Sequence, residues 1–149
     1  MAKSRKAPKY EQSLSAALIA AKDAVIAPMR PMLREYNITE PQCRVMRMIR
    51  DRRSAEAIEL VEIGGMYPPS VTRIIKELEG RKLLYREAHP SDRRRILVAL
   101  TPEGEELVNI ISLDVRRVAA EYSARFGAER LERLINELRA LTSSLHDIQ

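Results

Sequence analysis

The chain has 149 residues, of which 45% are hydrophobic and only 4% aromatic, so its core must consist mainly of aliphatic side chains. The length favours one domain, or one domain with a helical appendage. A single cysteine, Cys43, excludes an intramolecular disulfide framework. The sequence has neither a signal-peptide pattern nor an apolar stretch of the roughly 18 residues that a membrane span needs. These features predict a soluble, cytoplasmic protein.

The formal net charge of +5 is distributed unevenly along the chain. Residues 1–9 contain four bases and no acid, and residues 10–101 contain 16 bases and 12 acids. Residues 102–149 contain 6 bases and 9 acids. The first two-thirds therefore suit a polyanionic partner, whereas the acidic last third does not. We expect residues 1–9, which are basic and poor in apolar side chains, to form a disordered arm.

The segment from Glu11 to Tyr36 predicts a helix. Its apolar residues recur at alternating steps of four and three: Leu14, Leu18, Ala21, Val25, Pro28 and Met32. Pro28 and Pro31 should kink or interrupt this helix in its C-terminal third, because proline breaks the backbone hydrogen-bond ladder.

The next helix begins at a capping box, with Thr39 at the N-cap and Gln42 three residues later. It should end near residues 51–53 and bury three apolar side chains: Val45, Met46 and Ile49. Residues 54–56 predict a short strand or turn. Residues 58–63 predict a short helix, which the Gly64-Gly65 pair stops.

Pro68 and Pro69 begin the following helix, where proline is best tolerated. One face is apolar, with the spacing i, i+3, i+4, i+7: Val71, Ile74, Ile75 and Leu78. The opposite face is polar and basic: Ser70, Thr72, Arg73 and Lys76. Tyr67, just before this helix, could stack on a nucleic-acid sugar or pack against the protein, and we favour packing.

Two strands, residues 83–88 and 96–100, should form a hairpin around the basic loop 89–95. Thr101 and Pro102 then provide the N-cap and first residue of a long helix, which should end where Gly127 breaks it. The last helix has an apolar seam at steps of three and four: Leu131, Leu134, Leu138, Leu141, Leu145 and Ile148. A small domain cannot cover two such seams, which predicts burial against a second copy of the chain.

A helix, a glycine turn, a second helix and a basic hairpin follow the order of a winged helix-turn-helix. We therefore predict a mainly α fold with a small β-wing. An α-helix fits the major groove of DNA, where base edges can be read, and arginine side chains on a β-loop fit the electronegative minor groove. Residues 81–95 carry six bases and two acids, which agrees with this interpretation.

Residues 92–104 (DRRRILVALTPEG) resemble the wing motif of the MarR family of bacterial regulators, D-x-R-R-(apolar)-x-V-x-L-T-x-x-G, at every fixed position. Residues 39–47 and 68–79 resemble the second helix and the recognition helix of that family. The Pro68-Pro69-Ser70 segment, with Arg30-Pro31 upstream, is closest to the HpaR-like subgroup of homoprotocatechuate-pathway repressors. The resemblance spans roughly residues 14–145.

The resemblance implies a homodimeric DNA-binding transcription regulator, more often a repressor than an activator. Residues 10–36 and 102–149 would form the dimerisation region, and residues 37–101 the DNA-binding domain. The dimer would bind a pseudo-palindromic operator in double-stranded DNA. By the same resemblance, Arg94 would enter the minor groove while Asp92 pairs with it. The expected DNA-binding residues are Pro69, Ser70, Thr72, Arg73, Lys76, Asp92, Arg93, Arg94 and Arg95.

Members of the family often release DNA when they bind a small phenolic or aromatic acid. Arg30 and Tyr36 are our candidates for such an effector site, because arginine grips a carboxylate and tyrosine stacks and hydrogen-bonds. A surface ion pair for Arg30 and a core-edge position for Tyr36 are the favoured alternatives. The family often has tryptophan where this chain has Cys43, which leaves the effector's identity open. A redox role for Cys43 is a further alternative, but a buried, inert thiol is favoured.

Other classes of function fit the sequence less well. An enzyme is disfavoured because the chain has no phosphate-binding glycine loop, no nucleophile motif and no metal-ligand spacing. His89 and His146 are too far apart in sequence to suggest a metal site, so we expect no metal and no cofactor. A winged domain that binds only protein would need an apolar or acidic recognition face. Binding of single-stranded RNA would need an aromatic stacking platform, which the chain lacks.

Overall fold

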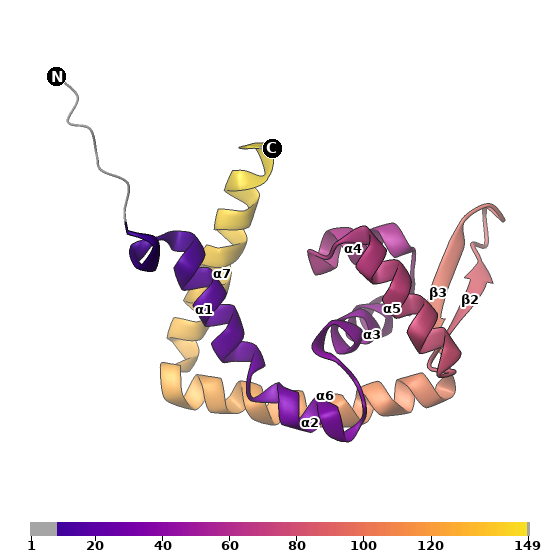
Figure 1. The fold of residues 1–149 in the computed structure, drawn as a ribbon, viewed down its shortest axis with the longest axis horizontal. Coiled ribbons are helices and arrows are strands. Elements are labelled where there is room, and N and C mark those ends of the chain that lie inside the picture. The colour runs from indigo at the N-terminus through magenta and orange to yellow at the C-terminus, as the bar shows by residue number, and fades with distance from the viewer. Residues whose placement is uncertain (1–8, 149) are drawn as a thin grey trace. The chain divides into compact units, whose positions relative to one another are not determined.

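The computed structural model describes residues 9–148, in which helices predominate and one small sheet is present (Figure 1). The chain divides into two compact units, Met1–Val108 and Asn109–Gln149. Apart from Lys9, the predicted basic arm lies outside the described residues. Across residues 9–148, every helix is too short or too polar to cross a membrane.

The single helix predicted from Glu11 to Tyr36 is divided in the structure. A 3-10 turn, η1 (Tyr10–Gln12), precedes α1 (Leu14–Ile26), and α2 (Met29–Glu35) follows after a break at Ala27 and Pro28. Pro28 thus interrupts the helix, as the sequence predicted, because a proline has no N–H to continue the ladder. In α1 no residue is buried, whereas α2 buries Leu33.

Helix α3 (Glu40–Arg52) begins with the predicted capping box. The Gln42 N–H donates to Thr39 Oγ1 at 3.3 Å, and the Thr39 N–H donates to Gln42 Oε1 at 3.0 Å. The three predicted core residues of this helix are fully buried: Val45, Met46 and Ile49. A two-residue strand, β1 (Ser54–Ala55), follows.

The helix-turn-helix consists of α4 (Ala57–Gly64) and α5 (Pro68–Gly80), which pack together (Figure 1). Gly65 ends α4 in the left-handed conformation, at φ 56°, a conformation that glycine adopts without strain. The predicted inward face of α5 is buried: Val71, Ile74, Ile75 and Leu78. The local signals of the sequence therefore located both helices correctly.

A three-stranded antiparallel sheet has the order β1-β3-β2, with β2 at Leu84–Ala88 and β3 at Ile96–Leu100. Val98 of β3 is the common register point, since it lies opposite Ala55 of β1 and Arg86 of β2. The inner end of the hairpin is buried, and its outer end is exposed. The hairpin therefore projects from the core as a wing (Figure 1).

Helix α6 (Pro102–Phe126) starts against the base of the wing. Thr101 caps it, because its hydroxyl accepts from the Gly104 N–H at 3.0 Å and donates to the Lys82 carbonyl at 2.7 Å. A Cβ atom on Gly104 would lie 2.1 Å from the Leu83 carbonyl oxygen. Only glycine permits this close approach of the helix to the backbone that leads into β2.

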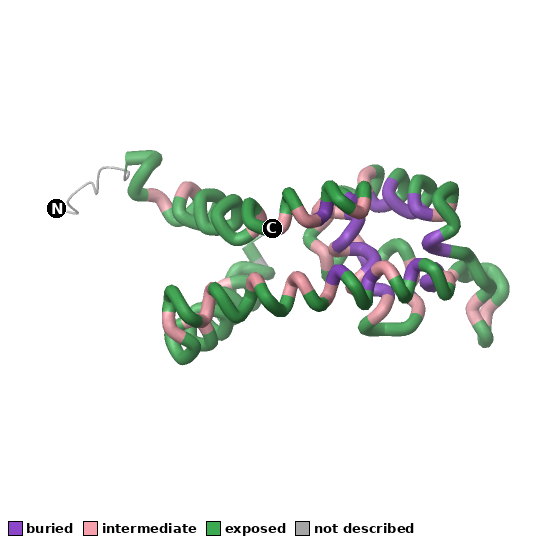
Figure 2. Tube along the Cα trace, turned by 90° about the horizontal axis from the view of Figure 1, so that it is seen from below, coloured by how far each residue is buried: buried purple, intermediate pink, exposed green. Residues whose placement is uncertain are grey.

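Helix α7 (Ala128–Leu145) and the 3-10 turn η2 (His146–Ile148) follow α6 and lie in the second compact unit. Helix α7 has no buried residue, although it carries the predicted apolar seam. Buried residues gather in α3, α5, the sheet and the first turns of α6, whereas α1 and α7 are exposed or half-buried along their length (Figure 2). Each of these two helices thus has an uncovered apolar face.

Candidate DNA-binding interface

The outward face of α5 carries the residues that the sequence predicted to contact DNA. Ser70 is half-buried. The other four are exposed: Pro69, Thr72, Arg73 and Lys76. The Thr72 hydroxyl donates to the Pro68 carbonyl at 3.2 Å, one turn earlier. Arg73 Nε lies 3.8 Å from Glu77 Oε1 on the same helix, and its side chain is 74% exposed. The guanidinium is therefore free to exchange Glu77 for another acceptor.

Tyr67 occupies the N-cap position of α5 and is 72% exposed. The favoured expectation that it packs against the protein is wrong. As the extended N-cap residue, at φ −73° and ψ 131°, it precedes α5 and does not belong to the buried face of that helix. The phenol side chain is thus largely exposed to solvent at the start of α5.

The loop of the wing is a compact turn. The His89 N–H donates to the Arg95 carbonyl at 3.0 Å and closes the hairpin. Inside it, the Arg95 N–H donates to the Asp92 carbonyl, also at 3.0 Å. Ser91 is held as well, since its hydroxyl lies 2.9 Å from His89 Nδ1. These bonds give the loop a defined backbone on which its arginine side chains are displayed.

Asp92 and Arg94 interact at the tip of the wing. Asp92 Oδ1 accepts from the Arg94 N–H at 3.0 Å, and Arg94 Nε lies 3.6 Å from the same oxygen. The Arg94 side chain is nevertheless 94% exposed. The carboxylate therefore fixes the backbone of the tip while the guanidinium projects into solvent.

Three other arginines of the basic segment have intramolecular partners. Arg81 donates to the Asn37 carbonyl at 2.6 Å, Arg86 pairs with Glu79 at 2.9 Å, and Arg95 pairs with Glu56. The charge count over residues 81–95 thus overstates the charge available to a partner. Sequence reasoning could not identify these pairs, because the partners lie between 7 and 44 residues apart.

Helix α5 is tied to α3 by a part-buried hydrogen bond that the sequence did not indicate. Gln42 Nε2 donates to Glu77 Oε2 at 3.0 Å, and Gln42 is only 8% exposed. The capping box identified Gln42 from its oxygen, but nothing in the sequence indicated a partner for its nitrogen. Glu77 consequently faces two groups, Gln42 through one oxygen and Arg73 through the other.

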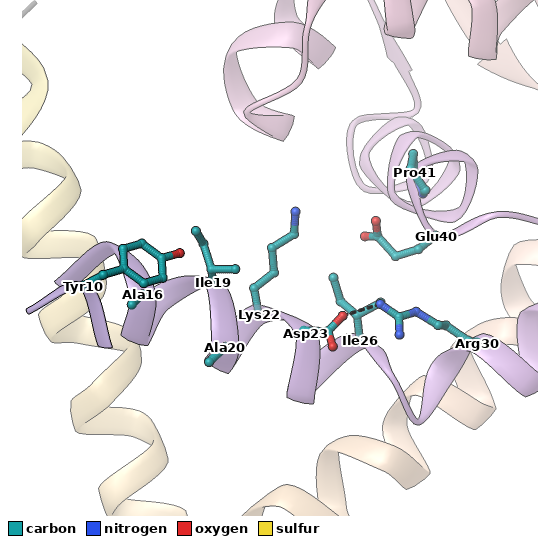
Figure 3. A pocket seen from close by; sticks show the side chains of 10 residues that line it. All are labelled: Tyr10, Ala16, Ile19, Ala20, Lys22, Asp23, Ile26, Arg30, Glu40 and Pro41. Atoms are coloured by element: carbon teal, nitrogen blue, oxygen red, sulfur yellow. Dashed lines mark hydrogen bonds and ion pairs between the residues drawn. The ribbon is translucent and has the colours of Figure 1, made fainter. Parts of the chain in front are cut away.

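A pocket of about 770 Å³ lies between α1, α2 and the first turn of α3 (Figure 3). Arg30 lines it and forms an ion pair with Asp23. Lys22 and Glu40 add a second cation and a second anion to the wall. Tyr36 lies at the C-cap of α2 and is not among the residues that line this pocket. The structure therefore brings only one of the two candidate effector residues to the pocket.

Cys43 is buried in α3, with 3% of its surface exposed. Burial is the largest cause that raises the pKa of its thiol above the usual range, and Glu40 adds to this effect. The thiol is therefore neutral near pH 7, and a neutral thiol is a poor nucleophile. Among residues 9–148, no group of three potential metal-ligating side chains is close enough to hold an ion.

The fold and this interface match known regulators. A model of the MarR family matches residues 38–96. The chain is 29% identical over 126 residues to the homoprotocatechuate degradative operon repressor of Escherichia coli, covering 85% of each protein. It is 30% identical over 135 residues to the HTH-type transcriptional regulator FarR of Neisseria gonorrhoeae, covering 91% of this chain and 92% of FarR.

A solved structure has a similar fold. The crystal structure of NadR in complex with 4-hydroxyphenylacetate is 29% identical and has a TM-score of 0.81, covering 91% of this chain and 96% of NadR. The two sequence relatives are thus a repressor and a transcriptional regulator, not enzymes. The chain belongs to the MarR family of winged helix-turn-helix transcription regulators.

Proposed function

We propose that this regulator binds an operator through the outward face of α5 and the tip of its wing. The observation that carries the proposal is the exposure of hydroxyl and cationic groups on both elements of one compact unit. The proposed DNA-contacting residues are those that the sequence indicated: Pro69, Ser70, Thr72, Arg73, Lys76, Asp92, Arg93, Arg94 and Arg95.

The two elements would read DNA in different ways. In the major groove, Arg73 can form a bidentate contact with guanine, and Thr72 and Lys76 can bond to base edges or phosphates. The wing would place Arg94 in the minor groove, where the negative potential attracts a cation but few groups distinguish the bases. Helix α5 would therefore supply sequence preference, and the wing would supply mainly affinity.

We propose further that the protein is a homodimer built from residues 10–36 and 102–149, with residues 37–101 as the DNA-binding domain. Neither α1 nor α7 buries a residue within one chain. Uncovered apolar positions occur on both helices, among them Leu14, Val25, Leu134 and Leu138. Apolar faces of this extent are typical of subunit interfaces. A folded monomer at micromolar concentration in sedimentation would contradict this part of the proposal.

The proposed outcome of operator binding is repression, relieved by a small aromatic or phenolic acid. Support comes from the E. coli relative, whose name is that of a repressor, and from NadR, whose structure contains 4-hydroxyphenylacetate. The pocket beside Arg30 is the proposed site for such an acid, because a guanidinium there can bind a carboxylate. Tyr36 would act only indirectly, through the end of α2.

The function is tested by selecting bound duplexes from a random pool. A two-fold dimer presents two copies of α5, so the selected sites should be pseudo-palindromes with half-site centres about 10 bp apart. Reporter expression from a promoter that contains the selected site should fall when the regulator is present. Recovery of no enriched duplex, or of sites without a dyad, would contradict the proposal.

A further inference from the structure

Few apolar contacts hold the outer half of the wing. In β2 only Leu84 is buried, and the remaining residues of the strand are exposed. Strand β3 starts with exposed Ile96 and half-buried Leu97 before it reaches buried Val98. Core burial therefore fixes the inner end of the hairpin but leaves the direction of its outer end to polar contacts.

The first polar contact joins the start of β3 to the start of α4. Arg95, directly before β3, donates through Nε to Oε1 of Glu56, the N-cap residue of α4. The side chain of Glu56 is 19% exposed, and that of Arg95 is 50% exposed. The backbone N–H of Glu56 also donates to Glu59 Oε2 at 2.7 Å, which holds this residue in place. A carboxylate is further favoured at a helix N-terminus by the helix dipole.

The second contact joins β2 to the end of α5. Arg86 Nε donates to both carboxylate oxygens of Glu79, at 2.9 and 3.0 Å. Arg86 lies opposite Val98 in the hairpin, where burial begins. Each strand of the wing is thus bound to one helix of the helix-turn-helix, β3 to α4 and β2 to α5.

We propose that the Glu56–Arg95 pair sets the direction of the wing relative to α5, and that Arg95 acts in DNA binding as a positioning residue. This role rests on the proposed contact of the wing with DNA, and it makes Arg95 a residue that positions the wing rather than one that contacts DNA. Arg94 can reach a groove without giving up a close partner, since Asp92 is 3.6 Å from its Nε. Arg95 is held beside the start of α4 through its Nε–H, so its side chain could extend fully toward a groove only by breaking this ion pair with Glu56.

The test uses the full-length protein and a duplex selected by it. Glu56→Gln, Arg95→Ala and the double variant are compared with Glu62→Gln, which removes the same charge from an exposed position of α4. If the pair positions the wing, each single variant should weaken binding about two- to fivefold, the range of a surface ion pair. The double variant should be no weaker than either single variant, because both changes break the same contact.

The salt dependence of binding separates positioning from contact. Arg95→Ala should leave the slope of log affinity against log salt unchanged, whereas Arg94→Ala should flatten it by about one unit. Arg95→Lys should recover part of the affinity, since it can restore an ion pair with Glu56. Melting temperatures should stay equal among the variants. If one variant melts earlier, the DNA affinities of all variants are measured at a temperature below its unfolding transition.

The opposite results would overturn the proposal. If Arg95 touches DNA, Glu56→Gln frees it and removes a nearby negative charge, so binding should become tighter, as with Glu62→Gln. Arg95→Ala would then flatten the salt slope, and the two effects would add. Should the wild-type protein bind no duplex, the proposed function itself fails. Tight wild-type binding that Glu56→Gln does not weaken overturns the positioning role alone.

Discussion

The side-chain amide of Gln42 connects the first turn of α3 to the recognition helix. Its nitrogen donates to Glu77 Oε2 at 3.0 Å, while its oxygen accepts from the Thr39 N–H at the same distance. Gln42 itself is buried, whereas the side chain of Glu77 is 48% exposed, so the bond between them is only partly shielded from water. Because Glu77 also lies 3.8 Å from Arg73, this amide supports the face of α5 that we propose to contact DNA.

Gln42→Ala should destabilise the fold. The change removes half of the capping box and the amide donor of the half-exposed Glu77, which together should lower the free energy of unfolding by about 1–2 kcal/mol. Denaturant unfolding at a fixed protein concentration measures the difference. Gln12→Ala, which removes the same side chain from an exposed turn, should cost less than about 0.5 kcal/mol. Equal unfolding midpoints for the two variants would show that the contact contributes nothing.

Gly104→Ala should be among the most damaging single substitutions in the chain. A Cβ atom there meets the Leu83 carbonyl oxygen at 2.1 Å, and both groups belong to backbone that cannot move freely. We expect a loss of about 3 kcal/mol or more in the free energy of unfolding. Gly80→Ala is the matched control: nothing lies within 4 Å of its Cβ position, so it should leave stability unchanged or raise it. Similar melting temperatures for the two variants would contradict this account.

The elements whose signals are local could be predicted from the sequence. The apolar spacing of Val71, Ile74 and Leu78 and the caps at Thr39 and Thr101 located their helices, because these patterns depend on neighbours within one or two turns. The family motif ends in Gly104, but only the structure gives the reason, since the carbonyl of Leu83, 21 residues earlier in the chain, approaches it.

Contacts between distant segments could not be predicted in the same way. The partner of Arg95 is 39 residues away and that of Gln42 is 35 residues away, so each depends on the packing of whole helices. The sequence therefore placed Arg95 with Arg94 as equivalent wing arginines, although Arg95 donates a side-chain hydrogen bond to Glu56 while Arg94 Nε lies 3.6 Å from Asp92. The sequence also suggested Arg30 and Tyr36 together as candidates for an effector site, whereas of these two residues only Arg30 lines the pocket.

Cys43 should be unreactive in the native protein. Burial raises the pKa of its thiol, so an uncharged alkylating reagent at pH 7.5 should label it only after unfolding. The raised pKa also makes the stability of the fold depend on pH. Burial of the neutral Cys43 thiol contributes fully to the free energy of unfolding below the pKa of the unfolded thiol. This contribution is lost as the pH rises through the pKa of the folded thiol, because the thiol of the unfolded chain ionises first. Rapid stoichiometric labelling of the native protein would instead support the redox alternative.

An anionic effector must compete with Asp23 for Arg30, because these two side chains already form an ion pair in the pocket. Asp23→Asn should therefore tighten the binding of an aromatic acid, while Arg30→Ala should weaken it. Calorimetric titration with 4-hydroxyphenylacetate and related phenolic acids measures both effects. Tyr36→Phe should change little, since Tyr36 does not line the pocket. Unchanged affinity in the Asp23 and Arg30 variants would place the effector elsewhere.

The central claim, that α5 and the wing bind duplex DNA in different ways, is tested most directly by one set of binding isotherms. Affinities of the wild type, Arg94→Ala and Arg73→Ala are measured for the selected operator and its single-base variants over a range of salt concentrations. Arg94→Ala should weaken binding to all duplexes alike and flatten the slope of log affinity against log salt by about one unit. Arg73→Ala should cost about 1–3 kcal/mol at the operator and relax the preference at one base position. Slopes and base preferences that match the wild type in both variants would contradict the account.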